Sequence, residues 1–279
     1  MTTRGNALVT GASSGIGAAI AMLLAEQGYR VWGTTRSLDR VESLPQELRD
    51  RVRFVAMDVT DDASVTDGVE KILEQAQSID LLVNNAGGAV YGPIEEMPME
   101  LTIKQFDLNV FGLLRVTQAV VPHMRERRQG MIINISSLAG KLVIPYQTHY
   151  SASKHAVEAF TEGLRQELRP FGIKVVSILP GDINTNFNNA TTFAPQVQGG
   201  QSPYEPWLKA SWETIDVNLR RAPGPEVVAR QVWKAVEDQG RKGRYPAGDF
   251  ASRQFLTLAR LLPDSLKEWA IRVFYRIKF

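Results

Sequence analysis

The sequence has 279 residues, and 44% of them are hydrophobic, so the chain can bury a substantial core. Lysine and arginine number 32 against 30 aspartates and glutamates, a balance that gives no overall field for nucleic acid, and we expect no nucleic-acid partner. The chain has no cysteine and only three histidines, which excludes a disulfide framework, a thiolate nucleophile and a cysteine-based metal site, and we expect no bound metal.

The amino terminus enters a short apolar strand and a glycine turn where a signal peptide would have a long apolar stretch. No run of the sequence reaches the roughly 18 to 20 apolar residues of a membrane-spanning helix. We therefore expect an intracellular, cytoplasmic protein.

Short stretches rich in Val, Ile and Leu alternate along the chain with longer segments of helical spacing. The predicted strands are residues 6–10, 30–34, 52–57, 79–83, 130–136 and 173–179. The predicted helices are residues 15–27, 63–77, 101–128 and 151–171. Asp61 and Asp62 favour the start of the second helix, and Pro170 and Gly172 favour the end of the fourth. This alternation predicts an α/β fold with a doubly wound parallel sheet flanked by helices.

The pattern changes after residue 180. Residues 187–222 mix turn formers with aromatic side chains, which predicts an irregular substrate loop over about 186–224. Residues 225–239 regain helical spacing, and Arg244–Ala247 is predicted as a last short strand. We expect one cofactor-binding and catalytic domain over residues 1–248 and a helical extension over residues 249–279.

The stretch TGASSGIG, residues 10–17, lies between the first predicted strand and the first predicted helix. Gly11, Gly15 and Gly17 allow a tight turn whose N–H groups, at the positive end of a helix, can bind a pyrophosphate. The spacing is G-x-x-x-G-x-G rather than the commoner G-x-G-x-x-G, and taken alone it also fits a tight loop without a ligand.

Two more polar clusters follow strands. DVTD, residues 58–61, ends the third predicted strand, and NNAG, residues 84–87, ends the fourth. Ligands of open α/β sheets bind beyond the carboxyl ends of the strands, so both clusters are predicted at the cofactor edge. The alternative is that Asn84 and Asn85 are ordinary turn residues.

Ser137 follows the fifth predicted strand, Tyr150 comes thirteen residues later, and Lys154 lies four residues beyond Tyr150 on the same helix face. Together with TGASSGIG and NNAG, in this order, these residues make the chain resemble the short-chain dehydrogenase/reductase family over about residues 5–190. The resemblance implies a Rossmann fold, a nicotinamide cofactor, and hydride transfer between a carbonyl and a secondary alcohol (CH–OH) group.

The resemblance also implies a role for each catalytic residue. Tyr150 would exchange a proton with the substrate oxygen, Ser137 would hydrogen-bond that oxygen, and the positive charge of Lys154 would favour ionised Tyr150. FDLNVFG matches the family pattern, so Asn109 would hold a water that links Lys154 to solvent. PGDINT, residues 180–185, resembles the family's loop beside the nicotinamide. The candidate cofactor-binding residues are Gly11, Ser13, Ser14, Gly15, Ile16, Gly17, Thr35, Arg36, Asp58, Val59, Asn85, Ala86, Gly87, Tyr150, Lys154, Pro180, Gly181, Ile183 and Thr185.

Arg36 predicts which nicotinamide cofactor is used. Dinucleotide folds that bind NAD place a carboxylate at the end of the second strand to accept hydrogen bonds from a ribose. This chain has Thr35 there, followed by Arg36, whose guanidinium can bind a 2′-phosphate through two hydrogen bonds. NADP(H) is therefore the expected cofactor, and the alternative is that Arg36 is a solvated surface residue.

The expected substrate is a small hydrophobic carbonyl or alcohol, because apolar residues cluster around the predicted site. The candidate substrate-binding residues are Ser137, Tyr150, Val90, Val143 and Phe187. The region after residue 170 and the extended carboxyl terminus most resemble family members that act on steroids (hydroxysteroid dehydrogenases), retinoids (retinol dehydrogenases) or other lipids.

The sequence allows alternatives for the carboxyl-terminal segment, the oligomeric state and turnover itself. The segment 249–279 mixes apolar residues with Arg260, Lys267, Arg272, Arg276 and Lys278, so it could pack on the body or a second subunit, or make a peripheral membrane contact. By resemblance, a homodimer or homotetramer built on the two long helices is expected. The alternative to a carbonyl reductase is a binding protein that senses NADPH without turnover.

Overall fold

The structure is a computed structural model that describes residues 3–187, 190–248 and 262–277. Seven strands form one parallel sheet in the order β3-β2-β1-β4-β6-β7-β9. The strands are β1 Gly5–Val9, β2 Tyr29–Thr35, β3 Val52–Ala56, β4 Leu81–Asn84, β6 Gly130–Ile135, β7 Ile173–Pro180 and β9 Arg244–Ala247. The chain runs from β1 outwards to β3 and then returns to the other side of β1 as β4. The predicted doubly wound parallel sheet is confirmed, and such sheets bind ligands at the carboxyl edge where the order reverses.

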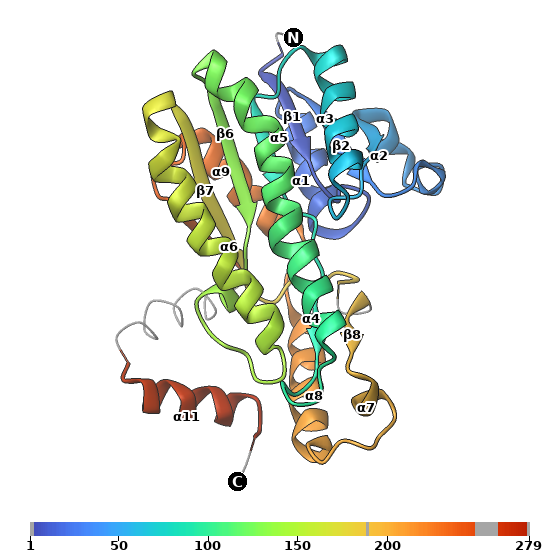
Figure 1. Cartoon of the computed structure of the whole chain (residues 1–279), viewed down its shortest axis with the longest axis vertical. Helices are drawn as coiled ribbons and strands as arrows, with labels where there is room; N and C mark the ends of the chain where they lie inside the picture. Colours follow the sequence, from blue (N-terminus) through green and yellow to red (C-terminus); the bar gives the residue numbers. More distant parts are fainter. Residues whose placement is uncertain (1–2, 188–189, 249–261, 278–279) are drawn as a thin grey trace.

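Helices cover both faces of the sheet (Figure 1). They are α1 Gly15–Glu26, α2 Gln46–Arg51, α3 Asp62–Ala76, α4 Met99–Phe106, α5 Gly112–Arg127, α6 Thr148–Glu167 and α9 Glu226–Glu237. Short 3₁₀ turns cover Leu38–Arg40, Leu138–Gly140 and Arg169–Phe171. The predicted ends are confirmed at two places: Asp61 Oδ1 accepts a hydrogen bond from the Ser64 N–H at 2.6 Å at the start of α3, and Gly172, with φ of 75°, ends the last turn after α6.

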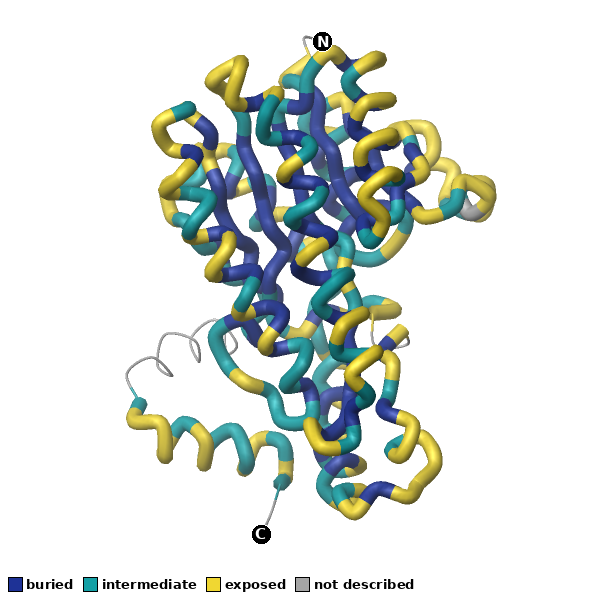
Figure 2. The backbone as a smooth tube through the Cα atoms, in the orientation of Figure 1, coloured by how far each residue is buried: buried dark blue, intermediate teal, exposed yellow. Residues whose placement is uncertain are grey.

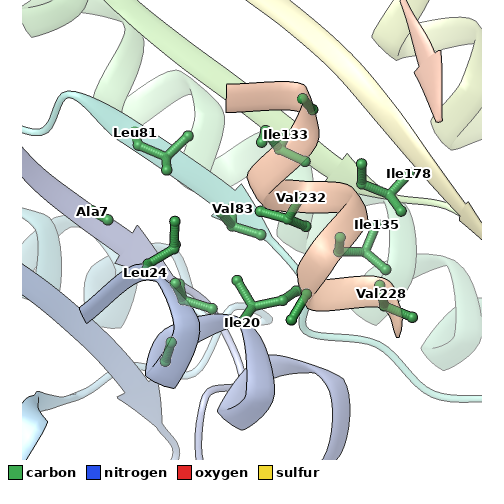
Figure 3. Packing of buried hydrophobic residues seen from close by; sticks show 14 of the residues in the cluster. Ala7, Ile20, Leu24, Leu81, Val83, Ile133, Ile135, Ile178, Val228 and Val232 are labelled. Atoms are coloured by element: carbon green, nitrogen blue, oxygen red, sulfur yellow. The ribbon is translucent and has the colours of Figure 1, made fainter. Parts of the chain in front are cut away.

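The strands are apolar on both faces because each face meets a layer of helices. In β1, Ala7 and Val9 belong to the cluster with α1 and α9, whereas Leu8 belongs to the cluster with α3 and α5. Figure 3 shows Leu24 of α1 and Val232 of α9 within the first cluster. Figure 2 shows the strands as the most deeply buried part of the molecule. The two clusters fix the sheet, and thereby the positions of the loops at its carboxyl edge.

The long helix predicted over 101–128 is interrupted. A π-helical turn, Asp107–Phe111, joins α4 to α5, and Asn109 lies in it. A π turn widens the helix by one residue per turn and often lies at a functional site. From this position the side chain of Asn109 reaches the loop after β4 and helix α6.

The prediction of an irregular loop over 187–222 is wrong for about two thirds of its length. It contains β8 Thr192–Phe193, α7 Pro195–Gln198 and the 17-residue helix α8 Glu205–Arg221. Strand β8 pairs with β5 Val90–Tyr91 in a separate two-stranded sheet. Together these elements form a cap beyond the carboxyl edge of the main sheet (Figure 1). The cap is stabilised by an aromatic cluster in which Tyr91, Phe193 and Trp212 meet with ring centroids 4.7–5.4 Å apart.

The carboxyl-terminal extension contains helix α11, Asp264–Phe274. Residues 249–261 and 278–279, including Arg260 and Lys278, lie outside the described residues. Among the described helices, none combines the length and hydropathy that crossing a bilayer requires.

Candidate active site

The glycine turn after β1 has a shape that larger residues would not allow. Gly11 and Gly15 have left-handed φ angles of 65° and 54°. A Cβ on Gly17 would lie 2.2 Å from the carbonyl oxygen of Gly11 and 2.5 Å from Asn85 Nδ2, so α1 can approach the turn this closely only with glycine there. The turn therefore forms a cradle of backbone atoms at the start of α1.

The first turn of α1 suits an anion. Its N-cap, Ser14, is extended, with φ of −160°, and within the described chain it makes no side-chain capping bond. The first-turn N–H groups and the positive helix end are then available to a phosphate. A Cβ on Gly15 would lie 3.6 Å from Thr185 Cβ, so the loop after β7 faces the glycine turn. The backbone cradle, the helix end and the nearby Thr185 fit a dinucleotide pyrophosphate.

Asn85 holds the glycine turn in place. Its Nδ2 donates hydrogen bonds to the carbonyl oxygens of Thr10 at 2.9 Å and Gly11 at 3.2 Å. In return, Thr10 Oγ1 accepts hydrogen bonds from the N–H groups of Asn85 and Ala86 at 2.9 and 3.0 Å. Asn84, the last residue of β4, is instead buried and donates to Asn134 Oδ1 at 3.0 Å. Asn85 therefore fixes the glycine turn, whereas Asn84 links strands β4 and β6.

Arg36 and Asp58 lie at the ends of neighbouring strands, β2 and β3. Arg36 is exposed, whereas Thr35 is buried and its hydroxyl donates to the Ser37 carbonyl oxygen at 3.2 Å. Partial burial acts to raise the pKa of Asp58, but two hydrogen bonds from Thr60, at 2.9 and 2.7 Å, and the charge of Arg36 outweigh it and lower the pKa. A guanidinium and an ionised carboxylate therefore stand close together at this corner of the sheet.

Ser137, Tyr150 and Lys154 meet beyond the end of β6. Tyr150 and Lys154 lie one turn apart on α6, and Lys154 Nζ is 5.8 Å from the centroid of the Tyr150 ring. Ser137 hydrogen-bonds Tyr150, and Ser137 Oγ also accepts a hydrogen bond from the Ala139 N–H at 3.1 Å. Lys154 Nζ donates to the carbonyl oxygen of Ile135 at 2.9 Å, which fixes the ammonium group under the tyrosine. The sequence grouped these three side chains, and the structure brings them together.

Burial has the largest effect on the pKa values of Tyr150 and Lys154. It raises the pKa of Tyr150, and the negative charge of Asp182 acts in the same direction, while the hydrogen bond with Ser137 acts against them. Burial also lowers the pKa of Lys154 from 10.5 to about 8, although the charge of Glu158 acts to raise it. The sequence argument expected the lysine to favour ionised tyrosine, but in the structure the desolvation of the hydroxyl is the larger effect.

Asn109 joins the loop after β4 to α6. The side chain is 2% exposed; Nδ2 donates to the Gly88 carbonyl oxygen and to Ser153 Oγ, both at 3.0 Å, and Oδ1 accepts from the Gly88 N–H at 2.9 Å. Ser153 directly precedes Lys154. Asn109 therefore orients the helix that carries the Tyr-Lys pair.

The predicted substrate residues have different surroundings. The ring of Phe187 lies 6.0 Å from that of Tyr150 and is 38% exposed, so it borders the group of Ser137, Tyr150 and Lys154. Val143 is half exposed, at 50%. Val90 is 6% exposed and packs inside the cap with Met97 and Ala194. The structure thus brings Phe187 to the tyrosine, whereas Val90 supports the cap from within.

Sequence reasoning missed two residues near Tyr150, namely Tyr275 and Asp182. Tyr275, just after α11, packs against the cluster of Tyr91, Leu208 and Ile215, and its pKa is raised by burial and by Asp182. Asp182 acts on both Tyr150 and Tyr275, so its carboxylate lies near both side chains. Asp182 stands inside PGDINT and could have been noticed there, whereas the sequence carries no local signal for Tyr275.

A buried carboxylate beside Lys154 was also missed. Glu158, one turn further along α6, is 2% exposed and is paired with Arg244 of β9 at 2.7 Å and with Lys141 at 3.3 Å. Burial acts to raise the pKa of Glu158, but these partners outweigh it and lower the pKa. The ionised carboxylate holds α6 against β9 and places a negative charge near the buried lysine.

A parallel sheet with a glycine cradle after β1 and a Ser-Tyr-Lys group at the same edge defines an oxidoreductase. A family model for the short chain dehydrogenases matches residues 5–195. The chain belongs to this family, as the resemblance predicted.

The chain is similar to several described members. It is 37% identical to a 3-ketodihydrosphingosine reductase of Bacteroides thetaiotaomicron, over 97% of this chain and 98% of that protein. It is 32% identical to an NADPH-dependent 3-dehydrocapnine reductase of Ornithobacterium rhinotracheale, over 97% and 96%. A crystal structure of a short-chain dehydrogenase from Streptomyces avermitilis matches all of both chains with 33% identity and a TM-score of 0.83. The similarity thus includes the cap and the carboxyl-terminal segment as well as the sheet.

Proposed function

We propose that the protein is an NADPH-dependent reductase that converts a ketone on a lipid-like substrate into a secondary alcohol, reversibly. One observation carries this proposal: Ser137, Tyr150 and Lys154 meet at the carboxyl edge of the sheet, beside a glycine cradle suited to a dinucleotide.

The residues support reduction as follows. When bound, NADPH supplies a hydride to the carbonyl carbon. Tyr150 donates its proton to the carbonyl oxygen, so that hydride and proton together give the alcohol. Ser137 holds the same oxygen by a hydrogen bond. Lys154, anchored on the Ile135 carbonyl, stabilises the negative charge left on the tyrosine until Tyr150 regains a proton.

The preference for NADPH over NADH rests on Arg36. An exposed guanidinium at the end of β2, where an acid would bind a ribose, suits a 2′-phosphate. The similarity to a reductase described as NADPH-dependent supports this assignment.

The substrate class rests on the wall of the site and on the relatives. Phe187, whose ring lies 6.0 Å from that of Tyr150 and is 38% exposed, presents an aromatic face to the site. Such a wall suits an apolar chain rather than a sugar. The two reductases named above act, by their names, on lipid-like ketones.

We further propose a cytoplasmic homodimer or homotetramer. Ile103 of α4, Phe111 of the π turn and Phe160 of α6 are 58%, 46% and 41% exposed. Large apolar side chains on these helices suit a contact between two copies of the chain.

A panel of ketones assayed with NADPH and NADH tests the proposal. We expect long-chain keto lipids to be reduced faster than short ketones, and only with NADPH at low cofactor concentration. Tyr150→Phe should lower kcat about 10²- to 10⁴-fold and leave the Kd for NADPH unchanged, because it removes the proton donor alone. Tyr29→Phe, at the start of β2, is the matched control and should keep full activity. Tight NADPH binding without turnover across the panel would contradict the proposal and favour a sensor.

A further inference from the structure

Helix α11 exposes a row of large apolar side chains. Leu266, Trp269, Val273 and Phe274 are 44%, 55%, 58% and 54% exposed. Their spacing puts them along one side of the helix. Within the part of the chain that the structure describes, α11 has no buried residue, as Figure 2 also shows. Four large apolar side chains exposed next to one another mark a binding surface.

The opposite side of the helix end is attached to the body. Tyr275 packs into the cluster of Tyr91, Leu208 and Ile215. It comes two residues after Val273, about 200° further around a helix, so Leu266, Trp269 and Val273 face away from this contact, while Phe274, at the edge of the row, has its ring centroid 5.0 Å from that of Tyr275. Asp182 acts on both Tyr275 and Tyr150, which places this contact near the proposed catalytic group. The segment is therefore anchored beside the site and presents its apolar row outward.

The charge of this segment is unlike that of the rest of the chain. Residues 249–279 contain six Lys and Arg against three Asp and Glu, a net charge of +3, whereas the other 248 residues sum to −1. In and just after α11 the charged residues are Asp264, Lys267, Glu268, Arg272 and Arg276. A net positive segment with an apolar row containing Trp and Phe complements an anionic lipid surface. Two copies meeting through this segment would bring like charges together.

We propose that α11 docks in the plane of an anionic lipid bilayer, with Leu266, Trp269, Val273 and Phe274 at headgroup depth. Docking by this face needs no spanning helix and leaves the sheet in water. It brings the cap beside the lipid, and a lipid-like substrate could then enter without crossing bulk water. That last consequence rests on the proposed function, whereas the docking itself does not.

Sedimentation of the full chain with vesicles tests the inference without measuring turnover. The wild type should bind vesicles containing phosphatidylglycerol more tightly than pure phosphatidylcholine vesicles, and salt should weaken the binding. Leu266→Ser, Val273→Ser and Phe274→Ser combined should lower the partition coefficient at least about tenfold. Ile94→Ser, which removes an equally exposed apolar side chain (65%) elsewhere, is the matched control and should change nothing.

Absence of wild-type binding to the anionic vesicles would overturn the inference, as would equal binding by the triple variant. If the triple variant lowers the mass measured by sedimentation velocity and wild type does not bind vesicles, the face is a contact between subunits and the membrane inference is wrong. The Kd for NADPH and the melting temperature check that the variant is folded. If it is not, Arg272→Gln with Arg276→Gln serves instead, and it should weaken vesicle binding about fivefold per charge removed.

Discussion

Replacing Lys154 with methionine tests whether its ammonium group is desolvated as the structure shows. Burial lowers the pKa of Lys154 from 10.5 to about 8, and the side chain is 6% exposed. Between these two values the unfolded chain binds more protons than the folded one, so the free energy of unfolding rises with pH. At about 1.36 kcal/mol per pKa unit, the charged lysine destabilises the fold by about 3 kcal/mol below pH 8, and most of this is relieved between pH 7 and pH 10.

Urea unfolding of wild type and Lys154→Met at intervals from pH 7 to pH 10 measures this effect. Other titrating groups are present in both proteins, so the difference between the two free energies of unfolding isolates residue 154. We expect that difference to move by about 2 to 3 kcal/mol in favour of the wild type as pH rises. Lys71→Met, on the exposed side of α3, is the control and should show no such trend. A pH-independent difference for Lys154→Met would refute the reasoning.

Three further predictions concern the proposed cofactor and the proposed proton donor Tyr150. Arg36→Ala should weaken NADPH binding about 10- to 100-fold and leave NADH binding unchanged; equal losses for both cofactors in calorimetric titration would count against a 2′-phosphate contact. Gly17→Ala should weaken both cofactors and lower the melting temperature, because its Cβ would lie 2.2 Å from a backbone oxygen, whereas Gly163→Ala in α6, with 3.7 Å of clearance, should stabilise by about 1 kcal/mol. Asp182→Asn should move the pH profile of alcohol oxidation to lower pH, since it removes a charge that raises the pKa of Tyr150; an unmoved profile would contradict this.

The sheet and most of the site could be predicted because their signals are local. The glycine turn, the strand that precedes it and the helix that follows it lie within about twenty residues. Tyr150 and Lys154 share a helix face by spacing alone. Parallel strands then bring their carboxyl ends to one edge, so residues far apart in the sequence meet there without further information. The predicted strand Arg244–Ala247 matches β9 at both ends.

Helix α8 of the cap was not predicted, because the turn-forming residues before it obscured the helical spacing of its apolar residues. Gly, Pro and Asn in residues 187–204 favoured a loop, and that prediction was extended over α8. The spacing of Leu208, Ile215 and Leu219, with Trp212 between them, is helical, and these side chains bury one face of α8 against Tyr91. The nearness of Asp182 to Tyr275 could not be predicted, because 93 residues separate them and Tyr275 belongs to no local pattern.

The pKa of Tyr150 shows what the sequence could not decide. The sequence shows a cation four residues from Tyr150, which would lower the pKa of the tyrosine, and apolar neighbours, which would raise it. It does not show which of the two effects is larger. In the structure Lys154 Nζ is 5.8 Å from the ring and hydrogen-bonded to Ile135, while the hydroxyl is desolvated and Asp182 adds a negative charge, so the pKa rises. A raised pKa keeps the proton on Tyr150 at neutral pH, which is the form that can protonate a carbonyl oxygen. The buried surroundings of the tyrosine therefore keep it protonated; in the proposed reduction the charge of Lys154 offsets part of the cost of giving that proton up, and oxidation of the alcohol must first remove it.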